Sequence, residues 1–244
     1  MAELITIPAA DGPAEAYLAR PVGAPRGAVL LIMDAIGLRP RIAEMADEIA
    51  SWGYVVLAPN VFYRVGTAAE TSPTTDLRLP ENRAAHFANT PVMIWVAALT
   101  PDLVERDAEA YANYLATLSP GPLAVTGYCF GARLATRMGG HLPQVVAVGG
   151  FHGSGLVTDA VDSPHLSVRP GIAYVFGHAD HDQGMPSEAV AELGEVLATS
   201  DPGALNAIYP GAAHGYTMAD TSVWNAEATE RHFRELRATL ERAF

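Results

Sequence analysis

Apolar positions along the chain follow two different periods. Some short stretches are continuously apolar or alternate with period two, which indicates strands, and others repeat apolar residues every three to four positions, which indicates helices. The expected strands span residues 4–7, 15–19, 27–33, 54–58, 123–127, 145–149, 172–176 and 204–209. The expected helices span residues 40–52, 102–118, 132–138, 186–197 and 222–244. Strands and helices therefore alternate along most of the chain.

The order of these elements predicts the fold class. Strands 4–7 and 15–19 form a small antiparallel hairpin, and the run 27–33 (GAVLLIM) is apolar throughout, as expected for a strand buried on both faces. Strands that alternate with helices build a parallel sheet covered by helices on both faces. No repeat, low-complexity tract or linker interrupts the chain, so we expect one α/β domain over residues 1–244.

Segment 64–100 is the exception to this alternation. It is long, rich in proline and threonine, and only weakly periodic. Loops of that length tend to be functional or mobile. Such a segment can lie over the carboxyl ends of the strands, where open α/β sheets bind their ligands.

Composition excludes several classes of protein. Half of the 244 residues are hydrophobic, the net charge is −12, and all fifteen basic residues are scattered arginines, which argues against disorder and against binding to nucleic acid or anionic membranes. One cysteine excludes an intrachain disulfide. The beginning of the chain does not resemble a signal peptide, and no apolar stretch is long enough to span a membrane. We expect a soluble cytoplasmic protein.

The only cysteine lies in the stretch Gly-Tyr-Cys-Phe-Gly at 127–131, between an expected strand and an expected helix. A nucleophile on a sharp strand-to-helix turn is exposed, and small neighbours are needed because the turn is crowded. The helix N-terminus lowers the pKa of a thiol there and stabilises negative charge. The alternative is that Cys129 is a small buried apolar residue, as free cysteines often are.

Two later motifs supply partners for a nucleophile. In α/β-hydrolases the acid and then the histidine follow the nucleophile along the chain. Asp180 lies in Gly-His-Ala-Asp-His-Asp at 177–182, just beyond an expected strand, and His214 lies in Pro-Gly-Ala-Ala-His-Gly-Tyr at 210–216, after the last one. We therefore predict the triad Cys129, Asp180 and His214. As alternatives, Asp180 caps a helix or turn, and His214 is an ordinary loop residue.

A metal site in the run 177–182 is a further alternative. Zinc needs three or four converging nitrogen, oxygen or sulfur ligands. The run lacks paired alternating histidines, and no second histidine cluster supplies the missing ligands. We expect no metal site.

With these three motifs, the chain resembles the dienelactone hydrolase (carboxymethylenebutenolidase-like) family of α/β-hydrolases. The resemblance runs from about residue 5 to the end and includes 52–64, where Asn60 replaces the usual aspartate. It implies an α/β-hydrolase fold without a separate cap domain, a Cys-His-Asp triad, no cofactor and no metal.

The loop after strand 27–33 has a family counterpart as well. Members usually carry Gln-Glu-Ile-Phe-Gly there, and the Glu contacts the thiol and helps to form the thiolate. Here Asp34 occupies that position, so the resemblance predicts a shorter thiol-activating acid, although Asp34 can also be a simple turn acid. The backbone amides of Ala35 and Phe130 lie where α/β-hydrolases place their two oxyanion donors.

The substrate-binding residues depart from the family. Members that hydrolyse dienelactone bind its carboxylate with two arginines, one of them four positions after the catalytic histidine, where this chain has Met218. Arg83 is the counterpart that we expect for the other arginine, with Arg78 as a competitor. Tyr216 and Met218 follow His214 closely and are expected to contact substrate.

Together these features predict a hydrolase that cleaves a small, largely apolar ester or lactone through a thioester intermediate. The alternative is an oxidant-sensing or ligand-binding protein on a hydrolase scaffold without turnover. Low-pKa thiols are oxidisable, but no second cysteine is present to resolve a sulfenic acid. The oligomeric state is not predicted by the sequence.

Overall fold

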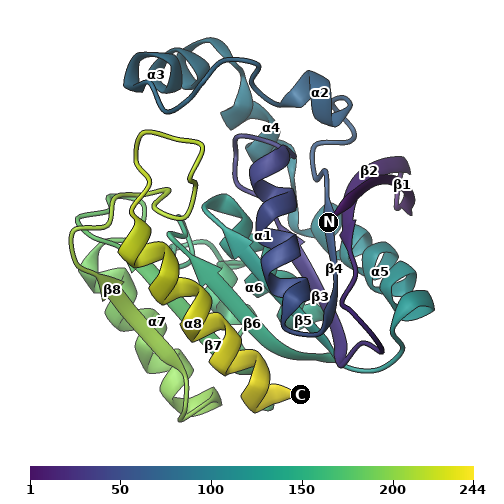
Figure 1. The fold of residues 1–244 in the computed structure, drawn as a ribbon. Helices are drawn as coiled ribbons and strands as arrows, with labels where there is room; N and C mark the ends of the chain where they lie inside the picture. Colours follow the sequence, from purple (N-terminus) through teal and green to yellow (C-terminus); the bar gives the residue numbers. More distant parts are fainter.

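A computed structural model describes residues 1–244 and contains one mixed sheet of eight strands in the order β1-β2-β4-β3-β5-β6-β7-β8 (Figure 1). The first two strands pair antiparallel, β2 pairs antiparallel with β4, and all remaining pairs are parallel. The strands are β1 (Glu3–Ala9), β2 (Gly12–Ala19), β3 (Gly27–Ile32), β4 (Tyr54–Pro59), β5 (Leu123–Tyr128), β6 (Val145–Phe151), β7 (Ala173–Ala179) and β8 (Leu205–Tyr209). The predicted α/β class is thus confirmed as an α/β-hydrolase fold.

Helices cover both faces of the sheet. In Figure 1, α1 and α8 lie in front of the strands, whereas α5, α6 and α7 lie behind them. The helices are α1 (Pro40–Ser51), α2 (Ala68–Thr71), α3 (Pro80–Asn89), α4 (Val92–Ala98), α5 (Pro101–Leu118), α6 (Phe130–His141), α7 (Ser187–Ser200) and α8 (Ala226–Ala243), with a 3₁₀ turn at Pro164–Ser167.

The central strands form because their residues can be buried on both sides. Every residue of β3, β4 and β5 is buried, so these three strands carry apolar side chains at nearly all positions, as parallel strands under two helical layers require. Gly53, between α1 and β4, has a φ of 104°, which is the left-handed conformation expected of the residue that ends this helix.

Segment 64–100 is more regular than its sequence predicts. It contains α2, α3 and α4, and it lies above the end of the sheet in Figure 1. Its helical period is weak because no residue of α3 is buried, so no apolar stripe is needed. Pro80 begins α3 at the first turn, where proline is tolerated. The segment thus places an exposed helix over the region where the candidate catalytic residues meet.

Candidate active site

Cys129 occupies a strained turn between β5 and α6. Its φ of 57° and ψ of −126° are rarely adopted by a residue with a side chain. Neighbouring backbone leaves no room for side chains at the two flanking glycines: a Cβ on Gly127 would lie 2.1 Å from the carbonyl oxygen of Gly131, and one on Gly131 would lie 2.4 Å from that of Met33. The geometry is that of a nucleophile elbow.

The thiol of Cys129 lies beside an imidazole that is itself held by a carboxylate. The Sγ atom is 3.1 Å from Nε2 of His214, and Nδ1 of His214 is 2.6 Å from Oδ2 of Asp182. His214 follows β8 and Asp182 follows β7, so two neighbouring strands position the pair. Thiol, imidazole and carboxylate are therefore connected in series, as a nucleophile, a base and an orienting acid must be.

The prediction that Asp180 contacts His214 is wrong. Strand β7 continues to Ala179, three residues beyond its expected end, and the carboxylate of Asp180 accepts a hydrogen bond from the amide of Gly211 instead. His181 then adopts a φ of 53°, which turns the chain and directs Asp182 inward. The side chain of Asp182 is 7% exposed, whereas that of Asp180 is 30% exposed.

The buried carboxylate and the thiol favour a charged imidazole. Burial opposes protonation of His214, but its hydrogen bonds to Asp182 and Cys129 outweigh that effect and raise its pKa to about 10. Burial likewise disfavours the Asp182 carboxylate, but the hydrogen bond with His214 holds the pKa of that carboxyl below its usual value. At neutral pH His214 is thus protonated and Asp182 ionised.

A second histidine that the sequence did not single out packs against this pair. The ring of His152 lies 5.4 Å from that of His214, edge to face, and its Nε2 is 2.7 Å from the hydroxyl of Thr217. Burial holds the pKa of His152 well below its usual value, so its ring is neutral. A neutral ring adds no permanent charge next to His214. It was missed because nothing in the sequence around it resembles a catalytic motif.

The two amides predicted as oxyanion donors are both available. Phe130 is the first residue of α6, so its N–H has no partner within the helix. The amide of Ala35 donates no hydrogen bond within the protein, although the next amide, that of Ile36, donates to Asp34 Oδ1 at 3.1 Å. Ala35 and Cys129 line the same cavity.

The expected contact between Asp34 and the thiol is not made. Both oxygens of the Asp34 carboxylate accept hydrogen bonds from Arg39, at 2.5 and 3.1 Å, and Arg39 also donates to Asp220. The side chains of Asp34 and Arg39 are each only 5% exposed. Asp34 therefore forms a buried ion pair that braces the loop carrying Ala35. The sequence could not distinguish this role, because Arg39 lies outside the motif at 33–37.

The Cys–His pair opens into a narrow cavity. Its lining comes from four parts of the chain: Asp34, Ala35 and Ile36; Arg83 and Phe87 of α3; Cys129; and the loop residues His214, Gly215, Met218, Thr221 and Val223. Arg83 and Met218 are thus placed beside the thiol. Tyr216 is not: its side chain is fully buried and its hydroxyl donates to the carbonyl of Gly177. The prediction that Tyr216 contacts substrate is therefore wrong, because its side chain does not line the cavity.

Arg83 brings an unpaired positive charge to this cavity. Its guanidinium lies over the ring of Phe87, 5.3 Å from the centroid, and its buried Nε has no hydrogen-bond partner. Arg78, the competing candidate, is exposed and paired with Asp76. Arg83 is half-buried, and Nε is the only guanidinium nitrogen that is enclosed without a partner.

The side chains of the run 177–182 point to separate partners. Nε2 of His178 is 2.7 Å from Asn206, and the carboxylates of Asp180 and Asp182 bind Gly211 and His214. No group of three or more His, Cys, Asp or Glu side chains is arranged to hold a metal ion. None of the helices is both long and apolar enough to cross a bilayer.

Comparison with known proteins identifies a family and several relatives. The family described as "Dienelactone hydrolase family" matches residues 14–244. A provisionally named carboxymethylenebutenolidase from Synechocystis sp. is 26% identical over 244 residues, which cover 98% of this chain and 95% of that protein. A counterpart from Yersinia pestis is 25% identical and covers 92% of this chain and 82% of its own length.

Solved structures share the fold. A provisionally named dienelactone hydrolase from Klebsiella pneumoniae superposes with a TM-score of 0.78 at 20% identity, covering 99% of this chain and 98% of that one. Esterase 2 of Thermogutta terrifontis, solved with propionate bound, superposes with a TM-score of 0.65 at 15% identity over 99% and 94% of the two chains. A serine hydrolase from Xanthomonas campestris described as having no lid also matches, with a TM-score of 0.58 at 16% identity over 99% and 93% of the two chains.

Proposed function

Because the chain belongs to the dienelactone hydrolase family, we propose that it hydrolyses an ester or lactone through a thioester on Cys129. One observation carries this proposal: Sγ of Cys129 is 3.1 Å from His214, which is 2.6 Å from Asp182. The assignment of Asp182 replaces the predicted Asp180. The strained turn at Cys129 and the free amides of Ala35 and Phe130 support the same chemistry.

In the first half of the reaction the Cys129 thiolate attacks the substrate carbonyl carbon. The carbonyl oxygen becomes an oxyanion that accepts hydrogen bonds from the amides of Ala35 and Phe130, each worth about 3 kcal/mol in comparable sites. Collapse of this intermediate breaks the ester C–O bond, and the leaving oxygen takes the proton from His214. The result is a thioester, a free alcohol and a neutral imidazole that Asp182 keeps oriented.

In the second half, His214 takes a proton from water as the water oxygen attacks the thioester carbonyl. The new tetrahedral intermediate expels the Cys129 thiolate and releases the carboxylic acid. The imidazolium–thiolate pair is then restored. With a lactone, the alcohol and the acid are parts of one product molecule.

The cavity supports a small substrate that carries an anionic group. Arg83 offers an unpaired cation, while Met218 gives an apolar wall where carboxylate-binding relatives are expected to have a second arginine. We therefore infer a carboxylated lactone or activated ester that is held by one arginine rather than two. Dienelactone itself is one candidate within this class.

Hydrolysis of 4-nitrophenyl acetate by the wild type, Cys129→Ala and Cys129→Ser tests the nucleophile. We expect loss of activity in Cys129→Ala, and a mass increase of one acetyl group on wild-type Cys129 in rapidly quenched samples. Unchanged turnover in Cys129→Ala would overturn the assignment and favour a scaffold without a thiol mechanism. A screen of lactones with and without a carboxylate, using Arg83→Gln as the control, tests the substrate class.

A further inference from the structure

His152 is held in a strained conformation at the carboxyl end of β6. Its φ is 39°, and among the residues other than glycine only Cys129 and His181 also have a positive φ. The three residues follow the ends of β5, β6 and β7, which are neighbouring strands. Such strain persists where the surrounding structure enforces it and is common at functional sites. Cys129 and the turn at His181 both belong to the candidate active site, and His152 follows the strand between theirs.

The side chain of His152 contacts three of the four residues in the segment 214–217. Its ring lies 5.4 Å from the ring of His214 and 5.0 Å from that of Tyr216, edge to face in both cases. Its Nε2 is 2.7 Å from the hydroxyl oxygen of Thr217. Both partners of this hydrogen bond are fully buried, so water does not compete for it. His152 is therefore attached to the same short segment that carries His214.

The hydrogen bonds of His214 do not by themselves fix the plane of its ring. Asp182 and Cys129 contact the two ring nitrogens, at 2.6 and 3.1 Å. The ring can still tilt about the line through these nitrogens when its loop shifts. His152 opposes this motion, because its ring packs against His214 and its Nε2 holds Thr217. In a site of this kind a misplacement of about 1 Å can cost about a hundredfold in rate.

Both ends of the contact between His152 and Thr217 are anchored to the rest of the fold. The amide of His152 donates to the carbonyl of Gly177 in β7 at 2.7 Å, and the hydroxyl of Tyr216 donates to the same carbonyl at 3.1 Å. On the other side, the carbonyl of Thr217 accepts two hydrogen bonds from Arg41 of α1, at 3.2 and 2.8 Å. The contact therefore ties the position of the loop to the sheet and to α1.

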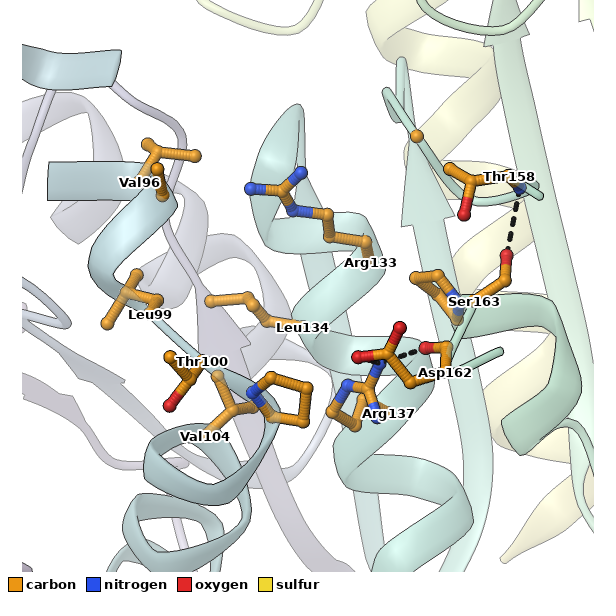
Figure 2. A pocket seen from close by; sticks show the side chains of 14 residues that line it. Val96, Leu99, Thr100, Val104, Arg133, Leu134, Arg137, Thr158, Asp162 and Ser163 are labelled. Atoms are coloured by element: carbon orange, nitrogen blue, oxygen red, sulfur yellow. Dashed lines mark hydrogen bonds and ion pairs between the residues drawn. The ribbon is translucent and has the colours of Figure 1, made fainter. Parts of the chain in front are cut away.

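The loop that follows His152 is fastened at its far end as well. The amide of Thr158 donates to the hydroxyl of Ser163 at 2.9 Å. Arg137 of α6 donates to the carbonyl of Asp162. Figure 2 shows these residues beside α6, with dashed lines between the partners. The backbone on both sides of His152 is thus held in place, which leaves its side chain little freedom to move.

We propose that His152 is a positioning residue: it holds the loop of His214 so that the imidazole stays aligned with the carboxylate of the triad and with the thiol. His152 does not line the cavity at Cys129, so it acts through His214 and Thr217 and not on the substrate. This inference rests on the proposed hydrolase function and adds to it a residue that sets the rate. Its loss should therefore lower kcat and leave KM nearly unchanged.

Hydrolysis of 4-nitrophenyl acetate by variants of Thr217 tests the effect on rate. Thr217→Val removes the hydroxyl that binds His152, and Thr217→Ser keeps it. We expect Thr217→Val to lower kcat about tenfold with KM within about twofold, and Thr217→Ser to stay within about threefold of wild-type kcat. Thr136→Val is the matched control, because Thr136 is equally buried but donates to the carbonyl of Ala132 within α6. It should keep wild-type kcat.

Nuclear magnetic resonance of the His214 ring separates positioning from a purely structural role, and it needs no turnover. In the wild type the pKa of His214 is raised to about 10. In Thr217→Val we expect it to fall by about one unit, because a displaced ring loses part of its hydrogen bond with Asp182. In Thr217→Ser and Thr136→Val it should stay at the wild-type value.

A double variant keeps the test decisive if a single change prevents folding. His152→Phe with Thr217→Val leaves neither partner of the hydrogen bond buried alone, so it should fold. If the two residues act as a unit, its kcat and its His214 titration should match those of Thr217→Val. Wild-type titration of His214 in the folded variants, with or without a loss of kcat, would overturn the proposal. Full esterase activity in Cys129→Ala would refute only the thioester mechanism.

Discussion

Exchange of Asp182 for asparagine should disable the base while leaving the fold in place. The rise in the pKa of His214 from 6.5 to about 10 corresponds to roughly 5 kcal/mol of preference for the imidazolium. Asp182 and Cys129 supply that preference against the opposing effect of burial. If each contributes about half, Asp182→Asn removes about 2–3 kcal/mol, and we expect kcat/KM to fall about 30- to 150-fold.

Nuclear magnetic resonance of the His214 ring measures the cause directly. In the wild type the ring should titrate near pH 10, and in Asp182→Asn its pKa should fall toward 6.5. Since the pKa of His214 is raised by folding, its contribution to stability is complete below pH 6.5 and is lost as the pH rises through about 10. The difference in unfolding free energy between wild type and Asp182→Asn should therefore shrink over that range.

Asp180→Asn is the matched control, because Asp180 is the same residue type only two positions away and binds the amide of Gly211 instead of the imidazole. We expect this variant to keep activity within about twofold and the His214 titration near pH 10. A larger loss of activity in Asp180→Asn than in Asp182→Asn would refute the reasoning and restore the assignment made from the sequence.

Three further predictions concern the Asp34–Arg39 ion pair, the turn at Cys129 and the pH dependence of activity. Arg39→Met leaves Asp34 buried without its partner, so urea unfolding should show a loss of about 3 kcal/mol or more, whereas Asp220→Asn, at the exposed end of the same bridge, should lose less than about 1 kcal/mol. Gly131→Ala forces a Cβ against the carbonyl of Met33, so it should lower the melting temperature by about 10 °C or more or prevent folding. Gly121→Ala is the control, because its Cβ would meet no atom within 4 Å and only backbone strain remains. It should cost about 1 kcal/mol, which lowers the melting temperature by only about 2–4 °C. Because the imidazolium must protonate the leaving oxygen, kcat/KM should decline as the pH rises through about 10, and a pH profile that instead declines near pH 7 would contradict the raised pKa of His214.

The sequence predicted the sheet and the nucleophile turn because both depend on local patterns. Runs of apolar residues marked β3, β4 and β5, which are buried throughout, and the two glycines around Cys129 marked a crowded turn. The helix α3 was missed because it buries none of its residues and so has no apolar stripe. Pro80 at its first turn was the one local signal that could have indicated it.

The site was predicted less well where it depends on how far an element extends. Strand β7 ends in the sequence Gly-His-Ala, which has little strand propensity. Pairing with β6 and β8 nevertheless extends the strand to Ala179. Because the strand is longer than predicted, the acid that contacts His214 is Asp182 and not Asp180. Asp34 was assigned by its place in a motif, whereas its neighbour in space, Arg39, decides what it does. Tyr216 lies two residues from His214 but points into the core.

The sheet carries the nucleophile and its partners at different distances from its edge. Cys129 follows the central strand β5, whereas Asp182 and His214 follow β7 and β8, and β8 is an edge strand that pairs with β7 alone. Edge strands open locally at a lower free energy than central ones. Gentle heating should therefore separate the imidazole from the thiol before the core melts. Heat inactivation of this enzyme would then be a local and reversible event, with hydrogen exchange in 205–209 as its earliest sign.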